Sequence, residues 1–196
     1  DTQIDVRYTP EERVVSLNRG EATFEVTHDP LRPFSVLVGD SVVQALGTVF
    51  NVQLKQDHQV EVAVTEGRVR VLRREVPAES LARPPALQSI AAEELLIGSV
   101  VHAGEVAVVE HEVSTIEKLR PEDIDVKLAW QRGMLIFRGE PLGVVLQEVG
   151  RYTDVEFELA DPRLASINIG GYFPAGDIDR LLVDLEETFA REGQVK

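Results

Sequence analysis

The bond between Gly47 and Thr48 is a place where a side chain of this 196-residue chain could attack its own backbone. A threonine hydroxyl can add to the preceding carbonyl if the backbone is strained there, which moves the acyl group from nitrogen to oxygen and leads to cleavage. The bond lies between Ala45-Leu46 and Val49-Phe50, where a tight bend would let Thr48 lead into a strand. The alternative is a glycine that serves only the turn, and the residues alone favour that alternative.

The histidines do not form a catalytic or metal-binding pattern. None stands in an H-x-x-x-H or H-E-x-x-H spacing, and the sequence has neither a P-loop nor a G-x-G-x-x-G motif. There is no cysteine, which excludes disulfides, thiolate nucleophiles and zinc–sulfur sites. We therefore predict no metal, no cofactor and no enzymatic activity, and single-turnover self-cleavage at Gly47-Thr48 is the one reaction that the sequence leaves open. We interpret the four histidines as surface residues: His28, His58, His102 and His111.

Acidic side chains outnumber basic ones by 34 to 20, so the formal net charge is −14. Nucleic-acid binding draws its affinity from clustered Lys and Arg, so this class of function is excluded. The acidic groups Glu156/Glu158 and Asp184/Glu186/Glu187 lack the glycine-turn spacing of a calcium loop, and we interpret them as solvated faces. The apolar fraction of 43% is typical of a globular protein, and the apolar runs are too short for a membrane span.

Short strands dominate the sequence up to residue 112. Apolar residues recur there at every second position, in runs that end at Gly, Asp or Pro. This pattern predicts an antiparallel all-β domain over residues 1–112, with a solenoid as one form that it could take. Residues 73–92 interrupt the pattern with three prolines, and we expect an exposed excursion there. The alternating residues are Ala22, Phe24 and Val26; Phe34, Val36 and Val38; Phe50, Val52 and Leu54; Val60, Val62 and Val64; Val69 and Val71; and Val106 and Val108.

A different periodicity follows the predicted interdomain connection, residues 113–128. Apolar residues at positions 142, 145, 146 and 149 share one helix face, and those at 178, 181, 182 and 185 repeat the spacing. The two sets differ by a constant 36 positions, and the same offset carries Phe137 onto Phe173. We therefore predict a small α+β domain of duplicated β-α-β units over residues 129–196, and a mixed fold class for the whole chain.

Each helix of the duplication should be followed by a returning strand. For the first unit this strand is Val155-Glu156-Phe157-Glu158-Leu159. For the second it can only begin near Val195, where the sequence stops, so we expect that strand to be truncated or the sheet to be completed in another way. In either case the small sheet should have unpaired edge strands.

Several short motifs occur together and in order along nearly the whole chain, and together they resemble the FecR family of periplasmic signal receivers. The most specific stretch is Ala45-Leu46-Gly47-Thr48-Val49-Phe50-Asn51-Val52. The duplicated β-α-β pattern resembles the secretin and TonB short N-terminal (STN) module. The supporting motifs are Leu17-Asn18-Arg19-Gly20-Glu21-Ala22-Thr23-Phe24-Glu25-Val26, Arg32-Pro33-Phe34, Glu66-Gly67-Arg68-Val69, Ala103-Gly104-Glu105 and Trp130-Gln131-Arg132-Gly133-Met134-Leu135-Ile136-Phe137.

The resemblance implies an anti-sigma regulator anchored in the inner membrane by one helix. Its periplasmic region would bind the signalling domain of a TonB-dependent outer-membrane transporter and relay the transporter's occupancy, for instance by an iron-siderophore complex. An extracytoplasmic-function sigma factor would receive the signal, held by a cytoplasmic domain that this sequence lacks. Envelope proteases would be further partners. Some members of the family also cleave themselves at a Gly-Thr bond that matches Gly47-Thr48.

Strand addition at an unpaired sheet edge is the binding mode that we expect for the C-terminal module. Phe137 and Phe173 occupy equivalent places in the repeat, which also fits two core residues, whereas Tyr172 alternates with Phe173 and should point the other way. The predicted partner-binding residues are Trp130, Leu135, Phe137, Tyr172 and Phe173.

A second function stays open: an envelope module that assembles with secretin or cell-wall components and regulates no sigma factor.

Overall fold

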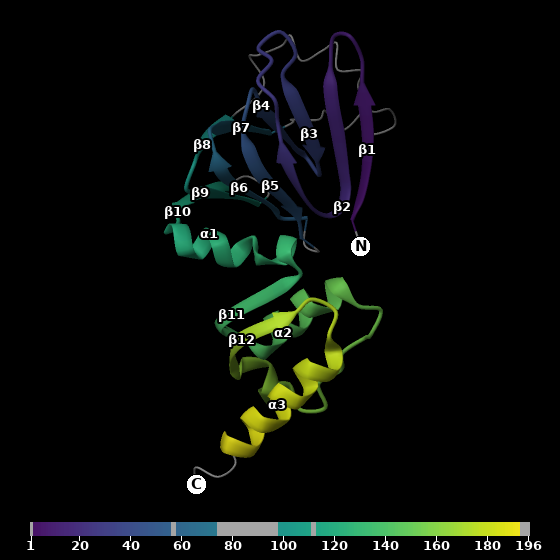
Figure 1. Ribbon diagram of the computed structural model, residues 1–196, viewed down its shortest axis with the longest axis vertical. Coiled ribbons are helices and arrows are strands. Elements are labelled where there is room, and N and C mark those ends of the chain that lie inside the picture. The colour runs from purple at the N-terminus through teal and green to yellow at the C-terminus, as the bar shows by residue number, and fades with distance from the viewer. Residues whose placement is uncertain (1, 56–57, 74–97, 111–112, 193–196) are drawn as a thin grey trace. The chain divides into compact units, whose positions relative to one another are not determined.

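The chain forms two compact units, Asp1–Arg120 and Pro121–Lys196 (Figure 1). The computed structural model describes residues 2–55, 58–73, 98–110 and 113–192. Within these residues no helix is both long enough and apolar enough to cross a membrane. The predicted excursion at 73–92, apart from Arg73, and the predicted strand start at Val195 lie outside the described residues.

Among its described residues, the first unit contains one large sheet of ten strands, in which the long strand β2 takes part twice. The first half of β2 pairs with β1 on one side and β3 on the other, and its second half pairs with β5. The order along the sheet is β10-β9-β6-β5-β2-β3-β4-β7-β8. The strands are β1 (Gln3–Tyr8), β2 (Arg13–Glu25), β3 (Phe34–Val38), β4 (Ser41–Ala45), β5 (Val49–Leu54), β6 (Val60–Glu66), β7 (Arg68–Arg73), β8 (Gly98–His102), β9 (Glu105–Glu110) and β10 (Val113–Lys118).

Tight corners carry the chain between the two halves of this sheet. The corners join β4 to β5, β6 to β7 and β8 to β9, and two of them contain glycines with positive φ, Gly67 at 78° and Gly104 at 87°. They lie beside one another, because the amide of Ala103 donates to the carbonyl of Gly67 at 3.0 Å. The strand β8 also contacts β6 and β9, so the sheet curls towards a closed barrel.

The core of the first unit lies inside this curled sheet. It consists mainly of valines, which suit the pleated surface of a strand. Phe24, Phe34 and Phe50 form an aromatic cluster, with ring centroids 5.4 Å apart for Phe24–Phe50 and 6.4 Å apart for Phe34–Phe50. Phe50, Val52, Val62 and Val64 are fully buried, which agrees with the alternation in the sequence.

The predicted fold class is wrong. The chain is mostly β, with 50% strand and 24% helix, and its large sheet is mixed and nearly barrel-shaped instead of antiparallel or solenoid-like. The strands β2 and β3 run parallel, with Val15 beside Val36. Residues 26–33 return the chain to the start of β2, so β3 enters the sheet in the same direction. Because period-two alternation is the same in parallel and antiparallel strands, the sequence pattern could not distinguish them.

The second unit packs helices against a two-stranded sheet. Its strands are β11 (Met134–Pro141) and β12 (Asn168–Pro174), which are antiparallel. Its helices are α1 (Pro121–Lys127), α2 (Leu142–Val149) and α3 (Ile178–Glu192), and it has the 3-10 turns η4 (Ala129–Arg132), η5 (Gly150–Tyr152) and η6 (Pro162–Ser166). Asp177 caps α3, because its Oδ1 accepts from the amide of Arg180 at 3.1 Å. The core is formed by α2, α3 and one face of the sheet.

The second part of the fold-class prediction, the duplicated β-α-β units, also fails. The strand and helix of each half are formed, but residues 155–159 form neither a strand nor a helix. Phe157 and Leu159 are partly buried against the core of the unit, so the alternation that suggested a strand reflects the packing of these two side chains. A strand also needs a neighbouring strand for its backbone groups, and the described part of the chain provides none for this segment.

Candidate protein-docking site

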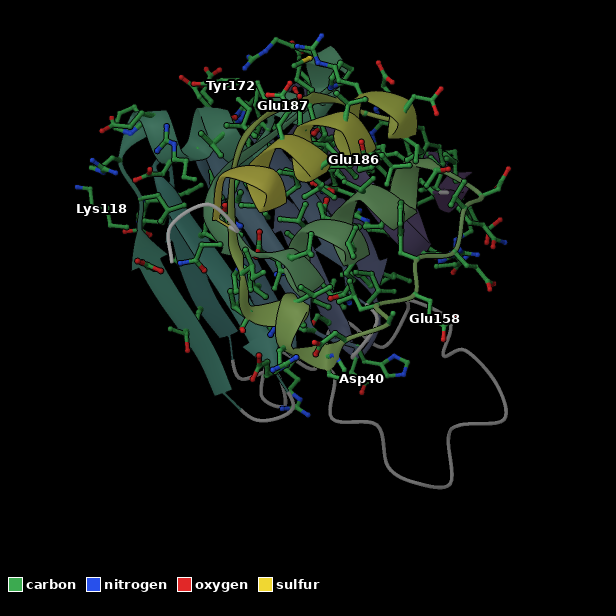
Figure 2. The ribbon with its side chains drawn as sticks, turned by 90° about the horizontal axis from the view of Figure 1, so that it is seen from below. Asp40, Lys118, Glu158, Tyr172, Glu186 and Glu187 are labelled. Atoms are coloured by element: carbon green, nitrogen blue, oxygen red, sulfur yellow. The ribbon has the colours of Figure 1, made fainter. Side chains whose placement is uncertain are left out.

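The sheet of the second unit has two apolar faces. Leu135 faces Phe173 across the ladder, and both side chains are buried against the helices. The next pair, Ile136 and Tyr172, points to the opposite face because side chains alternate along a strand. Tyr172 is 69% exposed and lies at the outer surface in Figure 2. The outer face therefore presents an aromatic ring that the described residues do not cover.

One edge of this sheet is also free. In the described part of the chain, β12 pairs with β11 alone, so its other edge has no strand beside it. A groove of about 180 Å³ runs along β12 and is lined by the backbone of Gly170 and Gly171 and by residues of α3. The residues from α3 are Asp184, Leu185 and Glu187. An extended segment of another protein could lie in this groove and bond to the strand.

The two glycines make the edge of β12 accessible. A Cβ atom on Gly171 would lie 2.9 Å from two ring atoms of Phe173, so the ring occupies the space that a side chain at 171 would need. Gly171 itself faces Phe137 in the ladder. The glycine thus serves the packing of the core and at the same time leaves the backbone of β12 without a side chain to shield it.

The strand β11 has neighbours of its own on the other side of the sheet. The helix α1 and the turn η4 pack beside it. Arg138 of β11 is fixed to α1 by two contacts, one to the Asp123 carboxylate at 2.6 Å and one to the Glu122 carbonyl at 3.3 Å. The edge of β12 is therefore the better candidate for strand addition.

The five predicted contact residues divide between core and surface. Leu135, Phe137 and Phe173 are buried, and the rings of Phe137 and Phe173 lie 5.8 Å apart in the core. Trp130, in η4, is half-buried against the same core, and its indole nitrogen is buried with no hydrogen-bond partner among the described residues. Of the five, only Tyr172 is largely exposed.

The second candidate site, Gly47-Thr48, forms the corner between β4 and β5. The Leu46 carbonyl accepts from the amide of Asp29 at 3.2 Å, and the Thr48 carbonyl accepts from the amide of Val26 at 2.9 Å, so both sides of the bond are fixed. Thr48 is buried, and its hydroxyl has no hydrogen-bond partner within the described residues. Such a hydroxyl is unusual in a protein core, where polar groups are nearly always paired.

Two residues beside this corner, His28 and Gly67, were not predicted to lie near the bond. A Cβ atom on Gly47 would lie 2.9 Å from the Cβ of His28, so the imidazole packs directly against the glycine. Gly67 closes the other side, because a Cβ there would lie 3.0 Å from the Gly47 carbonyl oxygen. These residues are 19 and 20 positions away from Gly47 and Thr48, and no motif links them. Their proximity depends on the stacking of the corners.

Comparisons with known proteins relate part of the first unit to a protein family. Residues 1–70 match the family described as FecR protein. Two crystal structures of a candidate anti-sigma factor from Parabacteroides distasonis ATCC 8503 are similar in fold. One has a TM-score of 0.67 at 22% identity and covers 94% of this chain and 78% of that chain. The other has a TM-score of 0.66 at 23% identity and covers 93% and 75%. The sequence matches no curated protein.

Proposed function

Because the chain is a FecR-family protein, we propose that it is the signal-receiver region of an anti-sigma regulator, and that the second unit receives the signal. The ligand of this unit would be the signalling domain of a TonB-dependent outer-membrane transporter. The chain would then lie in the periplasm, anchored in the inner membrane by one helix, and would relay iron-siderophore occupancy to an extracytoplasmic-function sigma factor. Envelope proteases would be further partners of the regulator.

The observation that carries this proposal is the free edge of β12 beside its groove. Unpaired backbone N–H and C=O groups at a sheet edge can be satisfied by a strand from another protein, which provides affinity without a cofactor. The exposed ring of Tyr172 lies next to this edge and supplies an apolar anchor. Leu135, Phe137 and Phe173 would act indirectly, by holding the sheet on the helices.

The charge of the groove adds a requirement on the partner. Asp184 and Glu187 line the groove together with Leu185. A strand that carried Lys or Arg towards α3 would be favoured there, and one that carried Asp or Glu would be repelled. We therefore propose that the docking strand of the signalling domain is basic on the side that faces α3.

The test is binding of the purified chain to the soluble signalling domain encoded beside it, followed by amide hydrogen exchange. We expect slower exchange at alternate residues within 170–173 in the complex, because every second amide of β12 points away from β11 and becomes bonded to the added strand. Unchanged exchange along β12 with intact binding would exclude strand addition at this edge. Binding to a secretin subunit or to peptidoglycan in place of the signalling domain would favour the envelope-module alternative.

We also propose that Gly47-Thr48 is a self-cleavage site, since the Thr48 hydroxyl is buried, adjacent to the bond and without a hydrogen-bond partner among the described residues. Thr48 Oγ1 would attack the Gly47 carbonyl carbon, and the C–N bond would break as the threonine nitrogen leaves as an amine. Water would then hydrolyse the ester to a Gly47 carboxylate and a free Thr48 hydroxyl. The His28 imidazole, which packs against Gly47, is the nearby group that could carry the proton.

Mass spectrometry of the denatured chain tests this second proposal. We expect two fragments, 1–47 and 48–196, from the wild-type protein and an intact chain from Thr48→Val. His28→Ala should slow the appearance of the fragments, and His58→Ala, a change at an exposed histidine on another turn, should not. An intact wild-type chain after prolonged incubation would show that Gly47 serves only the turn.

A further inference from the structure

The edge strand β1 of the first unit carries an apolar stripe that the described residues leave open. Ile4, Val6 and Tyr8 are 45%, 60% and 60% exposed. Ile4 faces Leu17 and Val6 faces Val15 across the ladder with β2, and both of these partners belong to the core. The stripe therefore lies on the same face of the sheet as the core, and it continues the apolar surface of that face into an exposed region.

The outer edge of β1 is free as well. Within the described residues, β1 pairs with β2 alone. Edge strands of monomeric proteins are usually protected by proline, by bulges or by charges on the apolar face. The only irregularity of β1 is at its start, between Gln3 and Ile4, and the ladder is regular from Ile4 to Tyr8. No charged side chain interrupts the stripe, because Asp5 and Arg7 point to the opposite face.

The sequence of this strand is complementary to itself. If two copies of β1 pair antiparallel with Val6 opposite Val6, then Ile4 lies opposite Tyr8 and Asp5 lies opposite Arg7 of the other copy. Both copies contribute their apolar stripe to the same face, and the opposite face carries two pairs of opposite charge. Each pair occurs twice because a two-fold axis passes between the two valines.

Other registers are disfavoured. A pairing centred on Asp5 places two carboxylates opposite each other, and one centred on Arg7 places two guanidinium groups opposite each other. A shift by a single residue would turn the stripe of one copy to the charged face of the other. The partners that Asp5 and Arg7 already have, Asn18 at 2.7 Å and Glu12 at 3.4 Å, leave further acceptor and donor positions available.

We propose that β1 is a self-association edge through which two copies of this chain form an antiparallel, Val6-centred dimer. The ten-stranded sheet then continues across the two-fold axis into the second copy. The dimer covers the stripe of Ile4, Val6 and Tyr8 and satisfies the free backbone groups of β1. This surface belongs to the first unit and is distinct from the edge of β12 proposed for the transporter.

A pair of single-cysteine variants tests the register, because the natural chain contains no cysteine. In the proposed dimer the two Val6→Cys residues lie opposite each other, at the Cα separation of about 4.5–5.5 Å that a disulfide accepts. The two Ile4→Cys residues are four positions apart along the strand, about 13 Å, which is too far for a disulfide. Both positions are exposed on the same face of the same strand, so each variant is the control of the other.

We expect mild oxidation with diamide to convert Val6→Cys into a covalent dimer and to leave Ile4→Cys without one. Light scattering of the wild-type chain should show a mass that rises with concentration towards twice 21.7 kDa. Equal cross-linking of the two variants would overturn the register. A monomeric mass at every concentration, with no cross-linking, would show that the stripe is covered in another way and would overturn the dimer.

Charge exchange provides a test that does not depend on cysteine chemistry. Asp5→Arg and Arg7→Asp each place like charges opposite one another at two points, so we expect each to weaken the dimer about tenfold. The double variant Asp5→Arg/Arg7→Asp restores both pairs and should return the dissociation constant close to that of the wild type. Failure of the double variant to recover, while its unfolding stays like that of the wild type, would contradict the pairing of Asp5 with Arg7.

Discussion

Ile136 and Tyr172 face each other across the β11–β12 ladder, on the side of the sheet that points away from the core of the second unit. The preceding pair, Leu135 and Phe173, is buried on the other side. A two-stranded sheet with apolar residues on both faces can bury only one of them against its own helices. The outer pair is therefore available to a partner, together with the free edge of β12.

Removal of the Tyr172 ring should weaken binding of the transporter's signalling domain. We expect Tyr172→Ala to raise Kd by at least about tenfold, because an aromatic anchor at the centre of an interface contributes on the order of 2 kcal/mol. The side chain is 69% exposed, so the free energy of unfolding should change by less than about 0.5 kcal/mol. Calorimetric titration gives the first quantity and urea unfolding the second.

The matched control for Tyr172 is Val144→Ala. Val144 is an exposed apolar residue of α2, 49% exposed and outside the groove. Its removal should leave Kd unchanged. If both variants bound as tightly as the wild type, the outer face of the sheet would not be the contact surface.

Two glycines of the second unit should respond to alanine with opposite signs. Gly171→Ala places a Cβ 2.9 Å from the ring of Phe173, and we expect a loss of about 1–3 kcal/mol in the free energy of unfolding, as for other overpacked cores. Gly143→Ala, in α2, places a Cβ 3.5 Å from Ala165, an ordinary contact, and should raise the free energy of unfolding by about 0.5–1 kcal/mol. Urea unfolding of both variants measures the difference, and equal signs would contradict the packing.

Local patterns in the sequence predicted several elements of this fold. The alternation at Phe50, Val52 and Leu54 identified β5, and the spacing at positions 142–149 identified α2. The alternation of Ile4, Val6 and Tyr8 with Asp5 and Arg7 carries the same signal for β1, which is not among the predicted strands. Alternation reports which side of a strand is buried, and this information is local.

The pairing of strands could not be read from the same patterns. Whether β3 joins β2 in the parallel or the antiparallel sense depends on the path of residues 26–33, and residues 155–159 alternate like a strand without having a neighbour. The surroundings of Gly47 are also non-local, since His28 and Gly67 reach it only after the corners have stacked. The sequence motif singled out the Gly47-Thr48 bond as a candidate site, whereas the presence of His28 and Gly67 beside it is known only from the fold.

The buried hydroxyl of Thr48 should reduce the stability of the first unit. Thr48→Val replaces a hydroxyl that no described residue pairs with by a methyl group of similar size, and we expect the free energy of unfolding to rise by about 1 kcal/mol. The control is Thr27→Val, the same change at an exposed threonine, which should stay within about 0.5 kcal/mol of the wild type. Unfolding in urea of the uncleaved protein measures both. A loss of stability in Thr48→Val would indicate that the hydroxyl has a partner in solution.

Acid should weaken the cap of η6, where Arg163 and Asp161 are paired. Hydrogen bonds from the Arg163 guanidinium, and then from its backbone amide, lower the pKa of the Asp161 carboxyl. A carboxyl with a lowered pKa stabilises the folded chain above its unfolded pKa, and this contribution disappears as the pH falls through the folded value. Carbon NMR titration should show the pKa of Asp161 rising in Arg163→Gln while staying below its ordinary value, because the backbone bond remains. Arg151→Gln, which breaks the pair with Glu148, should leave the pKa of Asp161 unchanged. A pKa of Asp161 that does not respond to Arg163→Gln would contradict the pairing.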